Sequence, residues 1–554
     1  GIVIITFGLC DTLMAQRNPV SISVDVQKTI KPLYPMWAYF GYDEPNYTYM
    51  KDGKKLLGEL AAMSKVPVYI RAHSLLTTGD GKAALKWGST NAYTEDASGN
   101  PIYNWAIMDS IFDTFIANGI KPIAEIGFTP EAMSTHPFPY QHHWKPGDPY
   151  NDIYTGWAYP PKDYTKWAEL VYQWVKHAVQ RYGEAEVKTW WWEVWNEPNI
   201  GYWKGTMEEY FMLYDFTSDA VKRACPTARV GGPATTGPDW NVAEDYLRQF
   251  LKHCAEGKNY ATGKTGSPLD MISFHAKGSP KVVDGHVRMN MSPQLRAVAK
   301  GFEVVMNSAF KTLPIYITEF DPEGCAACGM TTNPENAYRN GTMYSSYTAA
   351  SFTRLYDLAD LWKVNLAGSI SWSFEFENQP WFHGFRDLAT HGIDKPVLNV
   401  FRMLGMMQGN RIEVQNSSQI ALDSILKSSV RGSHADIHAL ASASTKTTSV
   451  MVWNYHDDDV QAEASSVTLT IKNIKATKVK LSQYRIDATL SNSYEAWKKM
   501  GSPQQVSDAQ YKLLEKAGQL QLASKPEYKT VSKGEVVIQL TMPRQAVTLI
   551  TLDY

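Results

Sequence analysis

Two glutamates in this 554-residue sequence stand where a β-rich run gives way to a turn. Glu197 lies in WWWEVWNEPNIGYW, residues 190–203, and Glu319 ends the run PIYITEF, residues 314–320. Hydrolysis of a glycosidic bond needs one carboxylic acid to protonate the leaving oxygen and a second carboxylate as nucleophile or base. Glu197 and Glu319 can form such a pair if they face one cleft; a helix cap or a surface charge is the alternative for either one alone.

The residues around Glu197 fit a sugar-binding cleft. Asn196 can donate a hydrogen bond to a sugar hydroxyl, and Pro198 restricts the backbone of the turn that presents both residues. Five tryptophans lie within residues 190–203, and flat apolar rings suit the face of a sugar as well as they suit a protein core. Core packing remains the alternative for each candidate sugar platform: Trp195, Trp203, Trp372 and Trp381.

The elements that must position these residues alternate between strand and helix patterns from residue 34 to residue 400. Apolar residues recur at spacings of three and four in 104–119 and in 164–183, as expected for helices. Eight β-rich runs separated by such helices predict an α/β fold of the (β/α)8 or TIM-barrel type. The predicted strands are 35–42, 66–73, 121–128, 188–195, 228–233, 270–276, 314–320 and 368–376.

In a barrel of this type, polar residues at the carboxyl ends of the strands form the active site. The residues at or next to the predicted strand ends form a chemically rich set. They are Asp43, His73, Phe128, Glu197, Gly232 with Pro233, His275, Glu319 and Glu375.

The pattern changes after residue 400, where alternating or β-branched runs are separated by turns. This pattern predicts a C-terminal antiparallel β-sandwich domain over residues 401–554. The run SISVDV (21–26) also alternates, so residues 17–33 are expected to add a strand to that sandwich.

Composition excludes several classes of protein. The formal net charge is −2 with no long basic run, which gives no reason to expect nucleic acid or an anionic membrane as a partner. No run of the roughly 20 apolar residues that a membrane helix needs is present. The chain has 18 Trp and 31 Tyr, an enrichment that suits ring-stacking sites and large aromatic cores alike.

Cysteines and the first residues bear on location. The pair Cys325 and Cys328 forms a lone C-x-x-C motif, for which a local disulfide or two packed thiols is favoured over a metal site. Residues 1–16 form a short apolar run ending in small residues, which is interpreted as a signal-peptide remnant. A secreted or periplasmic protein is therefore expected, and a buried first strand is the alternative.

The sequence resembles family 39 of the glycoside hydrolases, within the retaining (β/α)8 glycosidase clan. The resemblance rests on EVWNEPN, the VGGPAT of 230–235, the SFHAKG of 273–278 and the IYITEF of 315–320. The C-terminal runs KPVLNVFRMLG, YRIDATLSNSYEAWKKMGSP and LTMPRQAVTLITLDY extend it over nearly the whole chain after residue 30. That family holds β-xylosidases and α-L-iduronidases.

The resemblance implies roles for particular residues. Glu197 matches the general acid/base and Glu319 the nucleophile of a double displacement with retention. Asn196 matches the contact to the 2-hydroxyl, and His73 and His275 match histidines near the first sugar. No metal or organic cofactor is expected, because two carboxylates suffice for this reaction.

The identity of the sugar is left between two readings. Lys277, in FHAKG, resembles the lysine that contacts the substrate carboxylate in the iduronidase branch, and Arg386 stands where a second cation could join it. The favoured alternative is a neutral pentose, with Lys277 paired to an acid such as Asp43, Glu375 or Glu377. The loop EGCAACG and the tail AWKKMGSP resemble bacterial xylosidase-type members.

The expected function is an exo-glycosidase acting on β-xylosides or other oligosaccharides. The loops 140–160 and 376–386 are long enough to wall off a pocket. An iduronidase or arabinosidase activity, an endo-acting enzyme and a non-catalytic carbohydrate-binding protein are the alternatives. The resemblance also allows a homo-oligomer.

Overall fold

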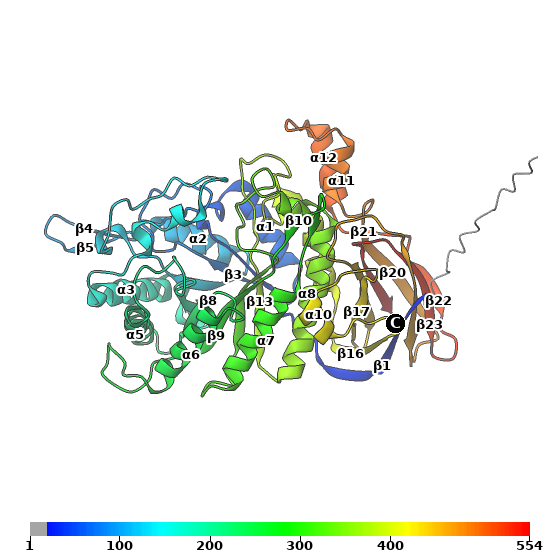
Figure 1. Cartoon of the computed structure of the whole chain (residues 1–554), viewed down its shortest axis with the longest axis horizontal. Helices are drawn as coiled ribbons and strands as arrows, with labels where there is room; N and C mark the ends of the chain where they lie inside the picture. The colour runs from blue at the N-terminus through cyan, green and yellow to red at the C-terminus, as the bar shows by residue number, and fades with distance from the viewer. Residues whose placement is uncertain (1–18) are drawn as a thin grey trace, which may run out of the picture.

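The computed structural model describes residues 19–554, and its two large sheets lie side by side (Figure 1). One is a closed barrel of parallel strands wrapped by helices, and the other is a mixed sheet built mainly from the C-terminal part of the chain. The expected signal-peptide remnant at 1–16 lies outside the described residues. The fold is the TIM barrel with a β-sandwich that the sequence predicts.

Eight strands close the barrel, and the strand periods seen in the sequence correspond to them. In β7 and the residue before it the side chains alternate: Trp191 and Glu193 point into the barrel, while Trp190 and Trp192 pack against the helices. This period of two is what a strand buried on both faces requires. The barrel strands are β2 (Tyr39–Tyr42), β3 (Tyr69–Ala72), β6 (Lys121–Ile126), β7 (Trp191–Val194), β8 (Arg229–Thr235), β9 (Met271–Lys277), β12 (Ile315–Asp321) and β13 (Leu366–Ser371).

The helices of the barrel carry an apolar stripe that covers the strands. In α3, Asp163 caps the first turn by accepting hydrogen bonds from two backbone N–H groups, and Gly183 ends the helix with a φ of 86°. The α-helices are α1 (Lys51–Ala62), α2 (Ala106–Ala117), α3 (Tyr164–Tyr182), α4 (Glu184–Val187), α5 (Met207–Ala224), α6 (Asn241–Glu256), α7 (Ser292–Met306), α8 (Thr342–Trp362) and α9 (Pro396–Met406).

Short elements decorate the loops between strands and helices. The 3₁₀ helices are η1 (Pro45–Tyr47), η2 (Glu131–Met133), η3 (Tyr150–Ile153), η4 (Gly156–Ala158) and η5 (Pro334–Asn340). The short strands pair as β4 (Tyr93–Glu95) with β5 (Pro101–Tyr103), β10 (Lys281–Val283) with β11 (His286–Arg288), and β14 (Ala389–Thr390) with β15 (Ile393–Asp394).

The second sheet has ten strands, and β1 from the start of the chain lies inside it between β16 and β19. The pairing of β1 with β19 is parallel, so the expectation of a purely antiparallel sandwich is wrong at this pair. No hairpin joins β1 to β19, so their relative direction is not set by a tight turn. The strands are β1 (Val20–Pro32), β16 (Asn410–Asn416), β17 (Asp436–Ala443), β18 (Thr447–Tyr455), β19 (Ser465–Lys472), β20 (Lys478–Ile486), β21 (Gln521–Leu522), β22 (Glu527–Thr530), β23 (Val536–Met542) and β24 (Val547–Asp553).

Three helices belong to this C-terminal part: α10 (Leu422–Ser428), α11 (Ser493–Lys499) and α12 (Asp508–Gly518). Helices α11 and α12 project beyond the sheet on the side of the barrel (Figure 1). Buried ion pairs join the two parts, including Arg354 of α8 with Asp436 of β17 at 3.0 Å. The core of the barrel therefore continues into the C-terminal sheet without a solvated gap at this contact.

Cys325 and Cys328 form a disulfide in the loop after β12. Among residues 19–554, Cys225 and Cys254 are buried free thiols. No helix in the same range is both long and apolar enough to span a bilayer.

Candidate active site

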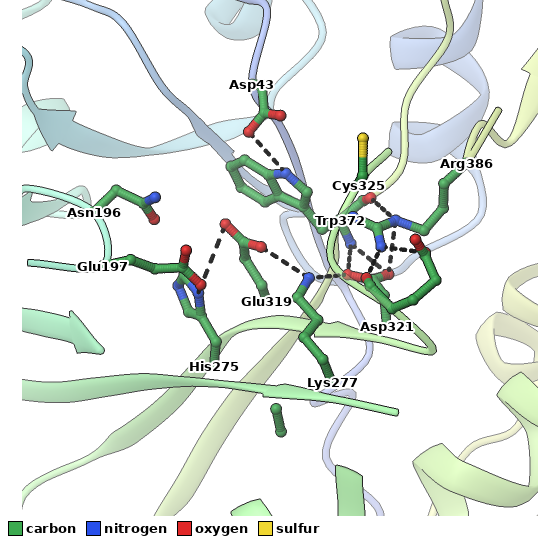
Figure 2. Close-up of polar contacts among 12 residues, drawn as sticks. Asp43, Asn196, Glu197, His275, Lys277, Glu319, Asp321, Cys325, Trp372 and Arg386 are labelled. Atoms are coloured by element: carbon green, nitrogen blue, oxygen red, sulfur yellow. Dashed lines mark hydrogen bonds and ion pairs between the residues drawn. The ribbon is translucent and has the colours of Figure 1, made fainter. Parts of the chain in front are cut away.

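Glu197 and Glu319 face one another at the carboxyl ends of the barrel strands (Figure 2). Glu319 is on β12, and Glu197 follows β7 by three residues. Nδ1 of His275, on β9, lies 2.8 Å from Oε1 of Glu197 and 3.8 Å from Oε1 of Glu319. One oxygen of each carboxylate and a ring nitrogen of His275 all lie within 4.8 Å of one another. The barrel thus brings both carboxylates to one place.

The turn that carries Glu197 has an unusual backbone. Trp195 has a φ of 68° and Glu197 a φ of 42°, in the left-handed region that residues with a Cβ seldom adopt. The Glu197 N–H donates to the carbonyl of Ala234 at 2.9 Å, and Asn199 exchanges hydrogen bonds of 2.7 and 3.0 Å with Thr236. These bonds to the end of β8 and to the loop after it offset the backbone strain and fix the position of the Glu197 carboxyl.

Four basic side chains surround Glu319, whose side chain is only 6% exposed. Nζ of Lys277 lies 2.8 Å from Oε2, while Nη1 of Arg71 and Nε2 of His73 lie 3.3 and 3.6 Å from Oε1. Burial raises the pKa of Glu319, but the positive charges of His275 and these three neighbours lower it to a net value well below its usual range. Glu319 is therefore an anion at neutral pH.

Glu197 has a sparser environment than Glu319. Its side chain is 14% exposed, and within residues 19–554 its carboxylate is hydrogen-bonded to a single side chain, that of His275. No lysine or arginine in that range pairs with it. Glu197 is therefore held by fewer neighbouring side chains than Glu319 is.

Arg71, on β3, is a buried hub inside the barrel. Its guanidinium forms an ion pair with Glu193, lies 2.8 Å from Oε2 of Glu125, and donates to Oδ1 of Asn196 at 3.0 Å. Because Oδ1 of Asn196 accepts this bond, its NH₂ group is left as a donor. The sequence analysis missed Arg71, Glu125 and Glu193. The available signal was a charged residue inside each of three apolar strands, since a buried charge needs a partner.

A second cluster lies on the other side of His73. Nδ1 of His73 is 3.0 Å from Oδ1 of Asp43, and Nε2 is 3.0 Å from Oε2 of Glu125. Asp43 also forms an ion pair with Lys86 and accepts a hydrogen bond of 3.1 Å from the indole of Trp372 (Figure 2). Burial lowers the pKa of His73, but Glu125 and Asp43 raise it to a net value of about 9. The imidazole is therefore positively charged at neutral pH.

A small pocket opens beside this second cluster. Its wall combines charged groups with aromatic rings from the loops after β3, β6 and β7. The lining residues are Asp43, His73, Ser74, Thr77, Lys86, Trp87, Phe128, Ile153, Trp157 and Tyr202.

Lys277 is paired on both sides by acids of β12. Its Nζ lies 2.8 Å from Glu319 and 3.0 Å from Oδ2 of Asp321. It does not contact any of the three acids that the sequence analysis named as partners. Adjacent parallel strands explain the difference, because β9 and β12 place Lys277 and Asp321 in register.

Arg386 does not reach the position that the sequence analysis gave it. It is fully buried, and its Nη1 donates to Oε1 of Glu323 at 2.6 Å while its Nε donates to the carbonyl of Trp372 at 2.8 Å. Strand β13 ends at Ser371, and the following loop places the Arg386 guanidinium against Trp372 and the loop after β12. A role beside Lys277 at a substrate carboxylate does not fit this geometry.

The tryptophans named as sugar platforms are buried. Trp195, Trp203 and Trp372 are 0%, 5% and 1% exposed. The indole of Trp195 donates to the carbonyl of Tyr202 at 3.0 Å, and that of Trp203 donates to the carbonyl of Thr206 at 2.8 Å. None of the three presents an open ring face. Trp195 and Trp203 pack in the core. Trp372 instead lies among side chains of the site, with its ring 4.5 Å from that of His73 and its indole N–H donated to Asp43.

Glu375 and Trp381 lie in the loop after β13, away from both carboxylates. Glu375 is buried and accepts a hydrogen bond of 2.6 Å from the N–H of Gly392, and burial raises its pKa well above the usual range. Trp381 stacks on His391 with ring centroids 4.3 Å apart. In the described part of the chain, neither residue contacts Glu197 or Glu319, so the predicted substrate contact by Glu375 does not fit this structure.

Two groups have the ligand types of a metal site. Asp43, His73 and Glu319 form one, and Glu197, His275 and Glu319 form the other, each with ligand atoms within 4.8 Å. Lysine and arginine cations already neutralise Asp43 and Glu319. The donor set therefore fits ion pairing at least as well as it fits a cation, and the expectation that no metal is needed stays a prediction.

Comparisons with known proteins agree with the motifs at the two glutamates. The model of glycosyl hydrolases family 39 matches residues 20–534. A β-xylosidase of Geobacillus stearothermophilus is 26% identical over 88% of this chain and 86% of its own length, and an α-L-iduronidase of Mus musculus is 24% identical over 89% and 75%. The structure of a monomeric β-xylosidase from Caulobacter crescentus CB15 superposes with a TM-score of 0.74 at 25% identity, covering 96% of this chain and 99% of that one.

Proposed function

The chain belongs to glycosyl hydrolases family 39, and on that premise we propose that it is a retaining exo-glycosidase that releases a terminal neutral sugar. The substrate we favour is a β-xyloside or xylo-oligosaccharide, with xylose as the product. Two curated relatives are β-xylosidases, one of them 28% identical over 80% of this chain.

The short distance between the two carboxylates carries the proposal. Their nearest oxygens lie within 4.8 Å, close to the spacing of roughly 5 Å typical of retaining enzymes and below the range of roughly 6.5–9.5 Å that leaves room for a water in inverting ones. A direct attack on the anomeric carbon by Glu319 fits this spacing. An inverting enzyme needs the wider spacing, because a nucleophilic water must fit between the base and the bound sugar.

The different surroundings of the two carboxyls assign the steps. Glu319, held as an anion, attacks the anomeric carbon while Glu197 gives its proton to the leaving oxygen, so the glycosidic bond breaks and a glycosyl ester forms on Glu319. Glu197 then removes a proton from water, whose oxygen attacks the anomeric carbon and releases the Glu319 carboxylate. The NH₂ group of Asn196 is directed to the sugar by its bond to Arg71.

A neutral sugar is favoured because the cations near the site are already matched. Lys277 is held by Glu319 and Asp321, Lys86 by Asp43, and Arg386 by Glu323. A uronic acid would bring a further negative charge to a site where these cations are shared with protein carboxylates. An iduronide remains the second candidate, because the side chain of Lys277 is 18% exposed beside Glu319.

The test is a panel of 4-nitrophenyl β-xyloside, α-L-arabinosides and β-glucoside together with a fluorogenic α-L-iduronide. We expect the enzyme to hydrolyse the β-xyloside and to release xylose whose anomeric configuration is initially retained. NMR of the anomeric proton measures that configuration. Release from the iduronide alone would overturn the neutral-sugar assignment. Binding of xylo-oligosaccharides with no turnover of any glycoside would indicate a carbohydrate-binding protein and would refute the proposed glycosidase activity.

A further inference from the structure

Lys86 is held in a strained conformation by two other parts of the chain. Its φ is 58°, in the left-handed region. Its N–H donates to Oε1 of Glu44 at 2.6 Å, and its carbonyl lies 2.9 Å from Nε2 of His142. A strained residue persists only where its surroundings over-determine it, and such residues gather at functional sites.

The strained backbone delivers the Lys86 ammonium into the pocket wall. Its side chain is 3% exposed, forms an ion pair with Asp43, and lies 3.4 Å from the hydroxyl of Tyr202. His73 contacts Asp43 on one side and Glu319 on the other, at 3.0 and 3.6 Å. A single imidazole therefore separates the Lys86–Asp43 pair from the carboxylate that attacks the sugar.

Thr77 supplies an independent sign that this pocket takes a ligand. Its side-chain oxygen is buried and finds no hydrogen-bond partner within residues 19–554, and the residue lines the same pocket as Lys86. An unpaired buried hydroxyl destabilises a folded protein. A ligand hydroxyl placed in the pocket would satisfy it.

We propose that Lys86 is a specificity-determining residue that bounds the sugar pocket and, with Asp43 and Thr77, hydrogen-bonds a ring hydroxyl remote from the anomeric carbon. This inference rests on the proposed function. A hydroxyl both donates and accepts, so it suits an ammonium and a carboxylate side by side, whereas a substrate carboxylate would be repelled by Asp43. The ligand class is therefore an unsubstituted neutral sugar.

The experiment is a double-mutant cycle in which one change removes the Lys86 ammonium and the other removes a hydroxyl of the substrate. We expect K86M to lower kcat/KM for 4-nitrophenyl β-xyloside by about 10- to 100-fold, the effect of a hydrogen bond to a charged group. The 3-deoxy and 4-deoxy xylosides are compared on wild type and K86M. For one of the two deoxy substrates, we expect kcat/KM of the wild type to fall by a factor similar to that caused by K86M. For the same substrate, kcat/KM of K86M should fall almost no further. If the loss in kcat/KM from K86M and the loss from the missing hydroxyl multiply for both deoxy substrates, Lys86 acts only on the fold and the proposal is overturned.

Three further variants keep the test decisive. K82M removes a lysine that is 86% exposed on the same loop and is expected to match wild type. The double variant K86M/D43N avoids leaving Asp43 buried without its cation, and it is expected to lose the same coupling. T77V should raise Tm, because it removes an unpaired hydroxyl, and should raise KM at the same time. If T77V changes neither KM nor kcat, the ligand role of the pocket is wrong.

The two proposals fail differently. A wild-type protein that turns over no glycoside in the panel refutes the proposed function. A wild type that hydrolyses the xyloside while K86M and T77V leave the deoxy series unchanged refutes only the role of Lys86.

Discussion

The surroundings of Glu319 and Glu197 differ more than their places in the barrel do. Glu319 lies near the carboxyl end of β12, Glu197 follows β7, and both contact His275. Glu319 is 6% exposed among four basic groups, whereas Glu197 is 14% exposed and has His275 alone as its side-chain partner in the described chain. Comparable positions in one barrel thus give one carboxylate that is enclosed by basic groups and one that has a single side-chain partner.

On the proposed assignment, the different environments divide two roles between residues of one type. Positive neighbours on β3 and β9 lower the pKa of Glu319 despite its burial. Glu197 is instead held by backbone hydrogen bonds in a strained turn. Pairs of carboxyls with divergent environments are how enzymes divide nucleophile and acid.

The largest expected effect comes from Glu319→Gln. The amide keeps the size of the side chain but cannot form the glycosyl ester, so kcat should fall by roughly 10⁴-fold or more. Initial-rate kinetics on 4-nitrophenyl β-xyloside measure it. Glu256→Gln, at a surface glutamate that is 65% exposed, is the control and should be silent. Residual activity near wild type would remove Glu319 from the nucleophile role.

Glu197→Gln should cost less, and the cost should depend on the leaving group. General acid catalysis contributes about 10²- to 10⁴-fold, so hydrolysis of xylobiose, which has a poor leaving group, should fall by about 10³-fold. A 4-nitrophenolate leaves without protonation, so glycosylation of the enzyme from that substrate should be much less affected. A loss that is equal for both substrates, measured under single-turnover conditions, would contradict the assignment of Glu197 as the acid.

A third prediction tests whether His73 is one of the charges that distinguish Glu319. Its folded pKa of about 9 lies above the unfolded value of roughly 6.5. Its contribution to stability is therefore complete below pH 6.5 and is lost as pH rises through 9, a decrease of roughly 3 kcal/mol. Urea unfolding across this window should show a decrease in wild type that is weaker in His73→Gln. His434→Gln, at an exposed histidine, should keep the wild-type slope.

The sequence predicted the strand ends well because their signal is local. A β-rich run that ends in a polar residue is readable without tertiary information, and Glu197, His275 and Glu319 all follow that rule. Arg71 was missed because it stands inside a strand, where an apolar run hides a single charge. Its partners Glu125 and Glu193 lie on the two following barrel strands, and only closure of the barrel brings the three together.

The positions of side chains in loops could not be predicted from local sequence for a different reason. Arg386 is turned inward by contacts to Glu323 and Trp372 that depend on where β13 stops. Lys86 reaches Asp43 only through a left-handed backbone held by another loop. No periodicity in the sequence encodes either placement. The tryptophan count had the same ambiguity, because burial and sugar stacking favour the same residue type.

The smallest expected effect comes from Lys277→Met. This variant measures how much Lys277 contributes to the difference in charged surroundings between Glu319 and Glu197. Its loss removes one of four positive neighbours of Glu319, so the pKa of Glu319 should rise and the acid limb of kcat/KM should move to higher pH. For a neutral xyloside, kcat/KM should fall by about 10-fold, the effect of one hydrogen bond to a charged group. Lys281→Met, at an exposed lysine on β10, is the matched control. If kcat/KM instead falls by 10³-fold or more for an iduronide alone, Lys277 binds the substrate carboxylate. The ion pairs of Lys277 with Glu319 and Asp321 would then describe the site before the substrate binds.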